Sequence, residues 1–249
     1  MQRYFVNRNQ VEQNRIVIRG DDVHHIKNVM RQGEGHRLIC CDGKGTDYHV
    51  RIEGMDHQQV QCVIEERLPS AGEPASRITV AQALPKGDKL EWVLQKGTEL
   101  GAFSFQPFVS ARTIVKLEGK KALKRQERWQ RIVKEAAEQA HRGRIPEIEL
   151  PVSWNSLLQT FGKYDRVLFA YEKEGNSLLS SLDHLDGKAS ILVVVGPEGG
   201  FTKQEAEEAI AAGAISLNLG PRILRAETAP LALLSCILFY FGEMGGEPL

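Results

Sequence analysis

The chain has 249 residues, of which 42% are hydrophobic and 26% charged, with 32 basic and 32 acidic side chains. This composition excludes collagen-like, coiled-coil and disordered chains and is typical of a globular protein with one large or two small domains. The formal charge of zero hides a split, because residues 86–144 carry 14 basic and 7 acidic groups, whereas residues 145–249 carry 7 basic and 14 acidic groups. A local excess of positive charge can mark a surface that binds a polyanion.

The first 70 residues have a hydrophobic period of two with turn signals between the runs, which predicts strands. The expected strands cover residues 15–19, 37–41, 48–53 and 60–67. One short helix is expected at residues 22–30. Short strands at this spacing favour a small β-barrel over residues 1–70. Residues 68–74 are rich in turn formers, so we expect a linker there.

After the linker the pattern changes to alternating strands and helices. Strands are expected at residues 77–83, 104–109, 166–171, 191–195 and 215–219. Helices are expected at residues 88–100, 120–142, 203–212 and 230–241. Alternation of this kind predicts an α/β domain with a mostly parallel sheet covered on both faces, which would occupy residues 75–249.

Several features bear on the compartment and on metals. The N-terminus lacks the apolar region of a signal peptide, and the longest apolar stretch, residues 230–242, is shorter than the roughly 20 residues that a membrane span needs. The four cysteines form no Cys-x-x-Cys pair and have no histidines at zinc spacing. We therefore expect a reduced cytoplasmic protein with no membrane segment and no metal site.

Two of the expected central strands each end in a Gly-Pro loop. These loops are GPEGGFT at residues 196–202 and GPRILRAET at residues 220–228. Ligands of open α/β sheets collect at the carboxyl ends of strands, where glycines let the backbone approach them closely. Thr202 with Glu205 forms a capping-box pattern, and Thr228 with Pro230 is a second helix-start signal.

Three interpretations of these loops are open. They are simple tight turns, a phosphate site, or a cavity for a cationic or zwitterionic cofactor near Glu198, Glu227 and Glu172. The phosphate interpretation is weak, because neither loop has the spacing of a P-loop or of a dinucleotide fingerprint. A carboxylate at Glu198 would also repel a phosphate.

The helix expected at residues 120–142 has two different faces. Basic residues fall within one sector of the helical wheel, and an alanine-rich face with Trp129 lies opposite. Such a stripe alone is more often a solvated face than a binding face. Together with Arg112, Arg142 and Arg144 it makes an electrostatic surface for a phosphate backbone plausible.

The loops and their neighbours resemble a known family. The strings VGPEGGFT (195–202) and LGPRILRAETA (219–229) are similar to signature loops of the SPOUT class of methyltransferases, and more narrowly of the RsmE family. That family methylates N3 of one uridine in the decoding region of bacterial 16S rRNA. Supporting strings are HHIKNVMR (24–31), KGDKLEWVLQKGTELG (86–101), SARTIV (110–115) and EAAEQAHRGRIPEI (135–148).

The resemblance implies a PUA-like RNA-binding barrel, a SPOUT domain with a deep trefoil knot, S-adenosylmethionine as cofactor, and a homodimer. It places cofactor contacts in three loops. The residues implied are Phe169, Ala170, Glu172, Gly196, Glu198, Gly199, Gly200, Leu219, Gly220, Ile223, Leu224, Arg225, Thr228 and Ala229. Contacts to the small ribosomal subunit are expected from Arg3, His25, Arg31, Arg112, Arg142 and Arg144.

The chemistry sets the requirements for catalysis. N3 of uracil is a poor nucleophile until it loses its proton, so the site needs a base or cations that stabilise the uracil anion. We expect Arg225 to stabilise the uracil oxygens or to position a phosphate, and Glu227 or Glu198 to orient groups or accept the proton.

Two other function classes compete with a methyltransferase. One is a non-catalytic RNA-binding assembly factor on the same fold, against which the intact Gly-Pro loops argue. The other is an α/β enzyme that uses a nucleotide or another phosphorylated ligand, against which the missing phosphate motifs argue. Binding of S-adenosylmethionine separates the methyltransferase from both.

Overall fold

The computed structural model describes residues 1–115, 119–171 and 175–245. The chain forms two compact units. Unit 1 comprises Met1–Glu73 together with Ala137–Ile145, and unit 2 comprises Pro74–Ala136 together with Pro146–Leu249. The units therefore differ from two continuous domains, because a nine-residue segment distant in sequence packs with the N-terminal part.

Unit 1 is built on a curled sheet with the strand order β1-β3-β4-β5-β2. The strands are β1 (Arg3–Phe5), β2 (Arg15–Arg19), β3 (Arg37–Cys41), β4 (Thr46–Met55) and β5 (Gln59–Pro69). Strand β1 pairs with β3 in parallel, and the remaining neighbours are antiparallel. Their apolar positions alternate, so Leu38, Val50 and Cys62 point into one common core.

Short helical segments close this sheet. They are η1 (Arg8–Gln10), α1 (Asp21–His24) and η2 (His25–Val29), of which η2 is a π-helical turn. Together α1 and η2 replace the regular helix expected at residues 22–30. The expected strands of this region are present, with β4 longer than predicted at both ends, because its pairing with β5 runs from Thr46 to Met55.

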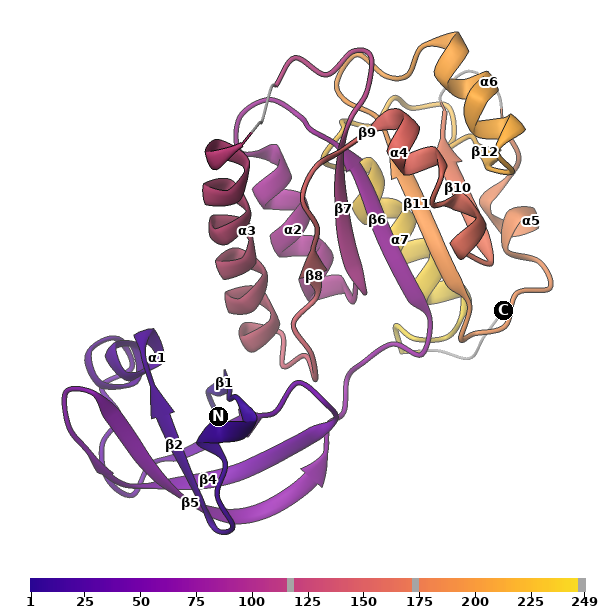
Figure 1. The fold of residues 1–249 in the computed structure, drawn as a ribbon. Coiled ribbons are helices and arrows are strands. Elements are labelled where there is room, and N and C mark those ends of the chain that lie inside the picture. Colours follow the sequence, from indigo (N-terminus) through magenta and orange to yellow (C-terminus); the bar gives the residue numbers. More distant parts are fainter. Residues whose placement is uncertain (116–118, 172–174, 246–249) are drawn as a thin grey trace. The chain divides into compact units, whose positions relative to one another are not determined.

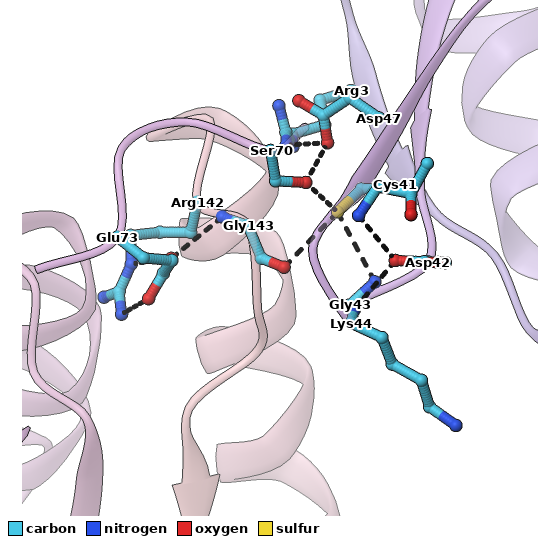
Figure 2. Close-up of polar contacts among 11 residues, drawn as sticks. Arg3, Cys41, Asp42, Gly43, Lys44, Asp47, Ser70, Glu73, Arg142 and Gly143 are labelled. Atoms are coloured by element: carbon cyan, nitrogen blue, oxygen red, sulfur yellow. Dashed lines mark hydrogen bonds and ion pairs between the residues drawn. The ribbon is translucent and has the colours of Figure 1, made fainter. Parts of the chain in front are cut away.

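The segment 137–145 is fastened to the sheet of unit 1 by polar contacts (Figure 2). Arg142 donates from Nε and Nη2 to the two carboxylate oxygens of Glu73, at 2.7 and 2.8 Å. The Gly143 amide donates to Glu73 at 2.8 Å, and the Gly143 carbonyl oxygen lies 3.4 Å from Cys41 Sγ. A Cβ on Gly143 would lie 3.0 Å from Ser70, so only glycine fits this approach without a shift.

Unit 2 holds a parallel sheet with the strand order β12-β10-β11-β6-β7-β8, and β9 also pairs with β7 (Figure 1). The strands are β6 (Arg77–Ala83), β7 (Ser104–Val109), β8 (Glu147–Ile148), β9 (Val152–Ser153), β10 (Arg166–Ala170), β11 (Ser190–Val195) and β12 (Ile215–Leu217). Every described pairing is parallel. The predicted α/β class is confirmed, and β11 is the expected central strand buried on both sides.

Helices cover both faces of this sheet (Figure 1). The helices of unit 2 are α2 (Lys89–Leu100), most of α3 (Lys120–Gln139), α4 (Trp154–Leu158), η3 (Phe161–Lys163), α5 (Leu178–Leu182), α6 (Lys203–Ala211) and α7 (Ala229–Tyr240). One face packs against α4 and α6 through a core that includes Phe108, Trp154 and Phe169. On the other face α7 contacts β6 and β11, and α2 packs on α7.

Sequence patterns missed the shortest elements. Strands β1, β8 and β9 and helices α4 and α5 have two to five residues each, too few for a periodic signal. Helix α3 ends three residues before the expected limit, since His141 takes a left-handed conformation with φ of 55°. Within the described residues, no helix combines the length and apolar character needed to cross a membrane.

Candidate active site

A cavity of about 480 Å³ lies in unit 2, at the carboxyl ends of β10, β11 and β12. Ligands of open parallel sheets collect at this edge, and the volume lies within the range of small-molecule sites. The cavity is lined by Lys89, Ala170, Tyr171, Val195, Gly196, Pro197, Glu198, Gly200, Phe201, Leu217, Asn218, Leu219, Gly220, Pro221, Arg222, Ile223, Leu224, Arg225, Ala226 and Ala229.

The first Gly-Pro loop is shaped by its packing on an aromatic cluster. A Cβ on Gly196 would lie 3.0 Å from the Phe201 ring, so the absence of a side chain lets this ring fold under the loop. The Phe201 and Phe169 ring centroids lie 4.3 Å apart, and both residues are buried. Gly200 has φ of 65°, a conformation that favours glycine. Aromatic packing thus provides a rigid floor beneath one wall of the cavity.

The predicted capping box at the start of α6 is confirmed. Thr202 Oγ1 accepts from the Glu205 amide at 3.1 Å, and the Thr202 amide donates to Glu205 Oε2 at 2.8 Å. The other Glu205 oxygen accepts from the Ala111 amide at 2.8 Å. This buried carboxylate therefore also ties the turn after β7 to the first loop.

The second Gly-Pro loop is ordered by hydrogen bonds that its backbone amides donate. Asn218 Oδ1 accepts from the Gly220 amide at 2.7 Å, and Gly220 has φ of 91°. The Thr228 amide donates to the Arg225 carbonyl oxygen at 2.9 Å. Thr228 is the N-cap of α7 and Pro230 stands in its first turn, as predicted, but the Thr228 side chain makes no capping bond.

The charged groups of the cavity meet at Lys89. Its Nζ lies 2.9 Å from Glu198 Oε1 and 3.5 Å from Glu227 Oε2. The Lys86 amide also donates to Glu198 Oε1, at 3.1 Å. Burial raises the pKa of Glu198, but the Lys89 hydrogen bond and backbone amides outweigh burial, so this pKa lies below its usual value. The hydrogen bond to Glu198 raises the pKa of Lys89. Both groups are therefore charged near neutral pH.

Glu227 and Arg225 differ in their exposure to solvent. The Glu227 side chain is 16% exposed, and its Oε2 atom is buried without a hydrogen bond among the described residues. The Arg225 side chain is 82% exposed, with Nη1 3.9 Å from Glu227 Oε1. Glu227 is therefore a partly buried partner of Lys89 that does not itself line the cavity, while Arg225 lines the cavity and is open to solvent.

Most residues predicted for the cofactor line this cavity. The lining includes Ala170, Gly196, Glu198, Gly200, Leu219, Gly220, Ile223, Leu224, Arg225 and Ala229. Phe169 does not line it, because its side chain belongs to the aromatic cluster. Gly199 and Thr228 lie in the same loops but outside the lining. Glu172 is outside the described residues.

Among the lining residues, Tyr171, Phe201 and Arg222 lie within the three loops predicted for the cofactor, whereas Lys89 and Asn218 lie outside them and were missed. A signal for Lys89 was present. It begins α2 just after the carboxyl end of β6, and parallel neighbouring strands bring such positions to the same edge of a sheet. The other missed residue, Asn218, adjoins a position that was predicted.

Two of the six arginine and histidine residues predicted to contact RNA are buried in ion pairs of unit 1. Arg3 pairs with Asp47, and Arg142 is bound bidentately by Glu73. Each side chain is 3% exposed. A contact to phosphate would require either arginine to leave its carboxylate, so the structure gives both a structural role.

The other four predicted RNA contacts differ among themselves. His25 Nδ1 lies 2.9 Å from Tyr4 Oη, and its ring packs edge-on against that tyrosine. Arg31 is exposed, and Arg112 is exposed and donates to the Gly199 carbonyl oxygen at 2.6 Å. Arg144 is half-buried. On α3, the exposed basic stripe and the buried Trp129 face are as predicted.

In the described ranges, no group of three or more histidine, cysteine, aspartate or glutamate side chains is arranged to hold a metal ion. The described cysteines are free thiols.

Comparison with known proteins identifies related domains in both parts of the chain. The family model for an RNA methyltransferase domain matches residues 72–238, and that for an RNA methyltransferase PUA domain matches residues 18–65. Ribosomal RNA small subunit methyltransferase E of Bacillus subtilis is 43% identical over 255 residues, which cover 99% of this chain and 100% of that protein.

Solved structures agree with this similarity. The crystal structure of a ribosomal RNA small subunit methyltransferase E from Neisseria gonorrhoeae, bound to S-adenosyl methionine, is 31% identical with a TM-score of 0.88, covering 96% of this chain and 97% of that one. A putative methyltransferase from Legionella pneumophila, in complex with the same cofactor, is 28% identical with a TM-score of 0.87, covering 95% and 96%.

Proposed function

Since the chain belongs to the ribosomal RNA small subunit methyltransferase E family, we propose that it transfers a methyl group from S-adenosylmethionine to small-subunit ribosomal RNA. The observation that carries the proposal is the cavity at the carboxyl ends of β10, β11 and β12, which both Gly-Pro loops line. The acceptor is N3 of a uridine in 16S rRNA, as the RsmE resemblance implies. The reaction takes place in the cytoplasm, where this RNA is found.

The cavity suits S-adenosylmethionine in size and in charge. This cofactor has a sulfonium and an ammonium group, and Glu198 supplies a carboxylate in the cavity lining. Gly196, Leu219 and Leu224 bring backbone groups and apolar surface to the same space. When bound, the cofactor supplies an electrophilic methyl group.

The chain's own residues then make uracil N3 reactive. The lowered pKa of Glu198 makes that carboxylate a weak base. Stabilisation of the uracil anion by a cation, with the N3 proton released to solvent, is the better-supported route, and Arg225 is an exposed cation of the cavity lining, as is Arg222. Glu227 Oε1, 3.9 Å from Arg225 Nη1, orients that guanidinium.

The RNA surface of the proposal uses exposed cations. Arg112 anchors the turn after β7 to the first Gly-Pro loop and remains exposed, which places it near the cavity. The basic stripe on α3 adds Lys120, Lys124 and Arg131, all exposed. Arg31 in unit 1 completes the set. Such contacts make RNA affinity fall steeply with salt.

The proposal includes a homodimer and the trefoil knot that the resemblance implies. An apolar groove in unit 2 is lined by residues of α5, of α7 and of the turn that follows α7, including Leu179, Phe239 and Met244, which are exposed. Exposed apolar patches of this kind mark interaction sites, and a second copy of the chain is the occupant we propose. Sedimentation velocity of Phe239→Glu against the unchanged protein tests this, with a shift to monomer expected.

Calorimetry and RNA mass spectrometry test the whole proposal. Purified protein should bind S-adenosylmethionine and add one N3-methyluridine to small subunits from cells that lack the protein. Arg225→Ala should lower kcat about 100-fold with little change in cofactor affinity. No cofactor binding would favour the non-catalytic assembly factor, and tight ATP or NAD binding without it would favour the nucleotide enzyme. An unaltered modification map would refute the assignment.

A further inference from the structure

Lys89 connects the two Gly-Pro loops of the cavity. It is the first residue of α2, and its Nζ lies within 2.9 Å of Glu198 in the first loop and 3.5 Å of Glu227 in the second. These loops are separated in sequence, and one ammonium group holds a carboxylate from each. Lys89 itself lines the cavity.

The segment that precedes α2 strengthens the contact to the first loop. The Lys86 amide donates to the same Glu198 oxygen that accepts from Lys89 Nζ. Glu198 is therefore held by a fixed backbone donor and by a side-chain cation. Glu227 has no comparable backbone donor among the described residues, and Lys89 and Arg225 are the cations within 4.0 Å of it.

Two carboxylates that lie close together repel each other, and each raises the other's pKa unless a cation lies between them. Arg225 is mostly exposed and 3.9 Å from Glu227, and Arg112 points to the Gly199 carbonyl oxygen. Lys89 is only 33% exposed and contacts both carboxylates. Among the charged groups around this cluster, Lys89 is the one placed to keep both carboxylates ionised and in position.

We propose that Lys89 is a positioning residue of the methyl-transfer site, holding Glu198 and Glu227 and thereby fixing the two Gly-Pro loops that line the cofactor cavity. The inference rests on the proposed function, because it takes S-adenosylmethionine as the ligand. It makes α2 a third element of the cofactor site, together with the two Gly-Pro loops.

Lys89→Met and Lys89→Arg test the inference, and Lys96→Met is the matched control. Lys96 lies on the same helix with 32% side-chain exposure, and it pairs with Glu99, outside the cavity lining. We expect Lys89→Met to raise the Kd for S-adenosylmethionine about tenfold, as expected for loss of one partly desolvated charge partner. Lys89→Arg should recover most of the affinity, and Lys96→Met should bind the cofactor as the unchanged protein does.

The pH dependence of cofactor binding distinguishes positioning from packing. Loss of Lys89 removes the contact that lowers the pKa of Glu198, so the acidic limb of the binding profile should move to higher pH in Lys89→Met. A loss of packing alone would weaken binding equally at every pH. An unchanged Kd with an unmoved limb would overturn the inference, as would an unchanged Kd combined with weaker RNA binding.

Hydrogen exchange on the cofactor-free protein keeps this test separate from the proposed function. We expect the amides of residues 196–201 and 219–229 to exchange faster in Lys89→Met than in Lys96→Met. If the unchanged protein binds no S-adenosylmethionine but this difference appears, the proposed function fails and the link between the loops stands. Equal exchange in the two variants would refute the link itself.

Discussion

Unit 1 and unit 2 each contain a cation held by carboxylate, but the two clusters differ in what they leave unsatisfied. In unit 1, Arg142 is 3% exposed and both oxygens of Glu73 accept hydrogen bonds. In unit 2, Lys89 is 33% exposed and one buried oxygen of Glu227 has no hydrogen bond within the described residues. A buried ion pair whose carboxylate oxygens both accept hydrogen bonds stabilises the fold. One that leaves a buried carboxylate oxygen without a hydrogen bond beside a cavity is typical of a ligand site.

This contrast changes the interpretation of the basic segment. From the sequence alone, Arg142 is expected to contact RNA phosphates together with Arg112 and Arg144. Net charge along a sequence cannot separate a guanidinium in solvent from one already bound to a carboxylate. Burial and partners make that separation, and they leave Arg112, Lys120, Lys124 and Arg131 as the candidates, because Arg128 already pairs with Glu91 at 2.7 Å.

The largest effect expected is on the cluster of unit 1. Arg142→Met leaves Glu73 without its charge partner and should lower the free energy of unfolding by roughly 3 kcal/mol. Guanidinium chloride unfolding, monitored through hydrogen exchange of the amides in β3–β5, measures this loss of stability. Glu65→Gln is the control, because its exposed pairs with Arg37 and Arg51 are worth less than about 1 kcal/mol. Unchanged stability with a smaller salt slope of RNA binding would instead make Arg142 an RNA contact.

The next largest effect is expected at a position in unit 2 where two backbone segments lie in close contact. A Cβ on Gly175 would lie 2.5 Å from the Leu217 carbonyl carbon and 2.6 Å from the Asn218 nitrogen, both in the cavity wall. Gly175→Ala should therefore displace this wall and weaken cofactor binding by about 1–3 kcal/mol. Gly162→Ala has open space and an ordinary φ, so it should bind the cofactor normally in the same calorimetric assay. Equal affinities of the two variants would contradict this account of the wall.

The effect that is smallest near neutral pH is a pH dependence of the stability of unit 1, which develops only under alkaline conditions. Burial raises the pKa of Cys62 from 9.0 to about 12. Between these values the folded chain keeps a proton that the unfolded chain loses, so stability is complete below pH 9 and falls as pH rises toward 12. The contribution is on the order of 1 kcal/mol per pH unit.

Cys62→Ala should reduce this alkaline slope in unfolding experiments at a series of pH values. Val60→Ala empties a buried position on the same strand without removing a thiol, so it should lower stability at every pH and keep the slope. If both variants keep the slope, Cys62 is not its source.

The two Gly-Pro loops could be predicted from the sequence because their signals are local. The Gly-Pro entries after β11 and β12 and the Thr202–Glu205 capping box are readable within a few residues. Lys89 was missed as part of the site because its partners lie 109 and 138 positions away, and no local pattern reports such a contact. The same holds for Glu73 and Arg142, 69 positions apart.

Unit 1 is made of two separate stretches of sequence, and this affects how it folds while the protein is synthesised. Glu73, Cys41 and Phe5 find their partners in residues 137–145, which are synthesised only after the first half of unit 2. Closing contacts over such distances costs chain entropy and slows folding. A nascent chain that ends at residue 73 therefore carries an unfinished N-terminal unit, which is completed only when α3 has left the exit tunnel.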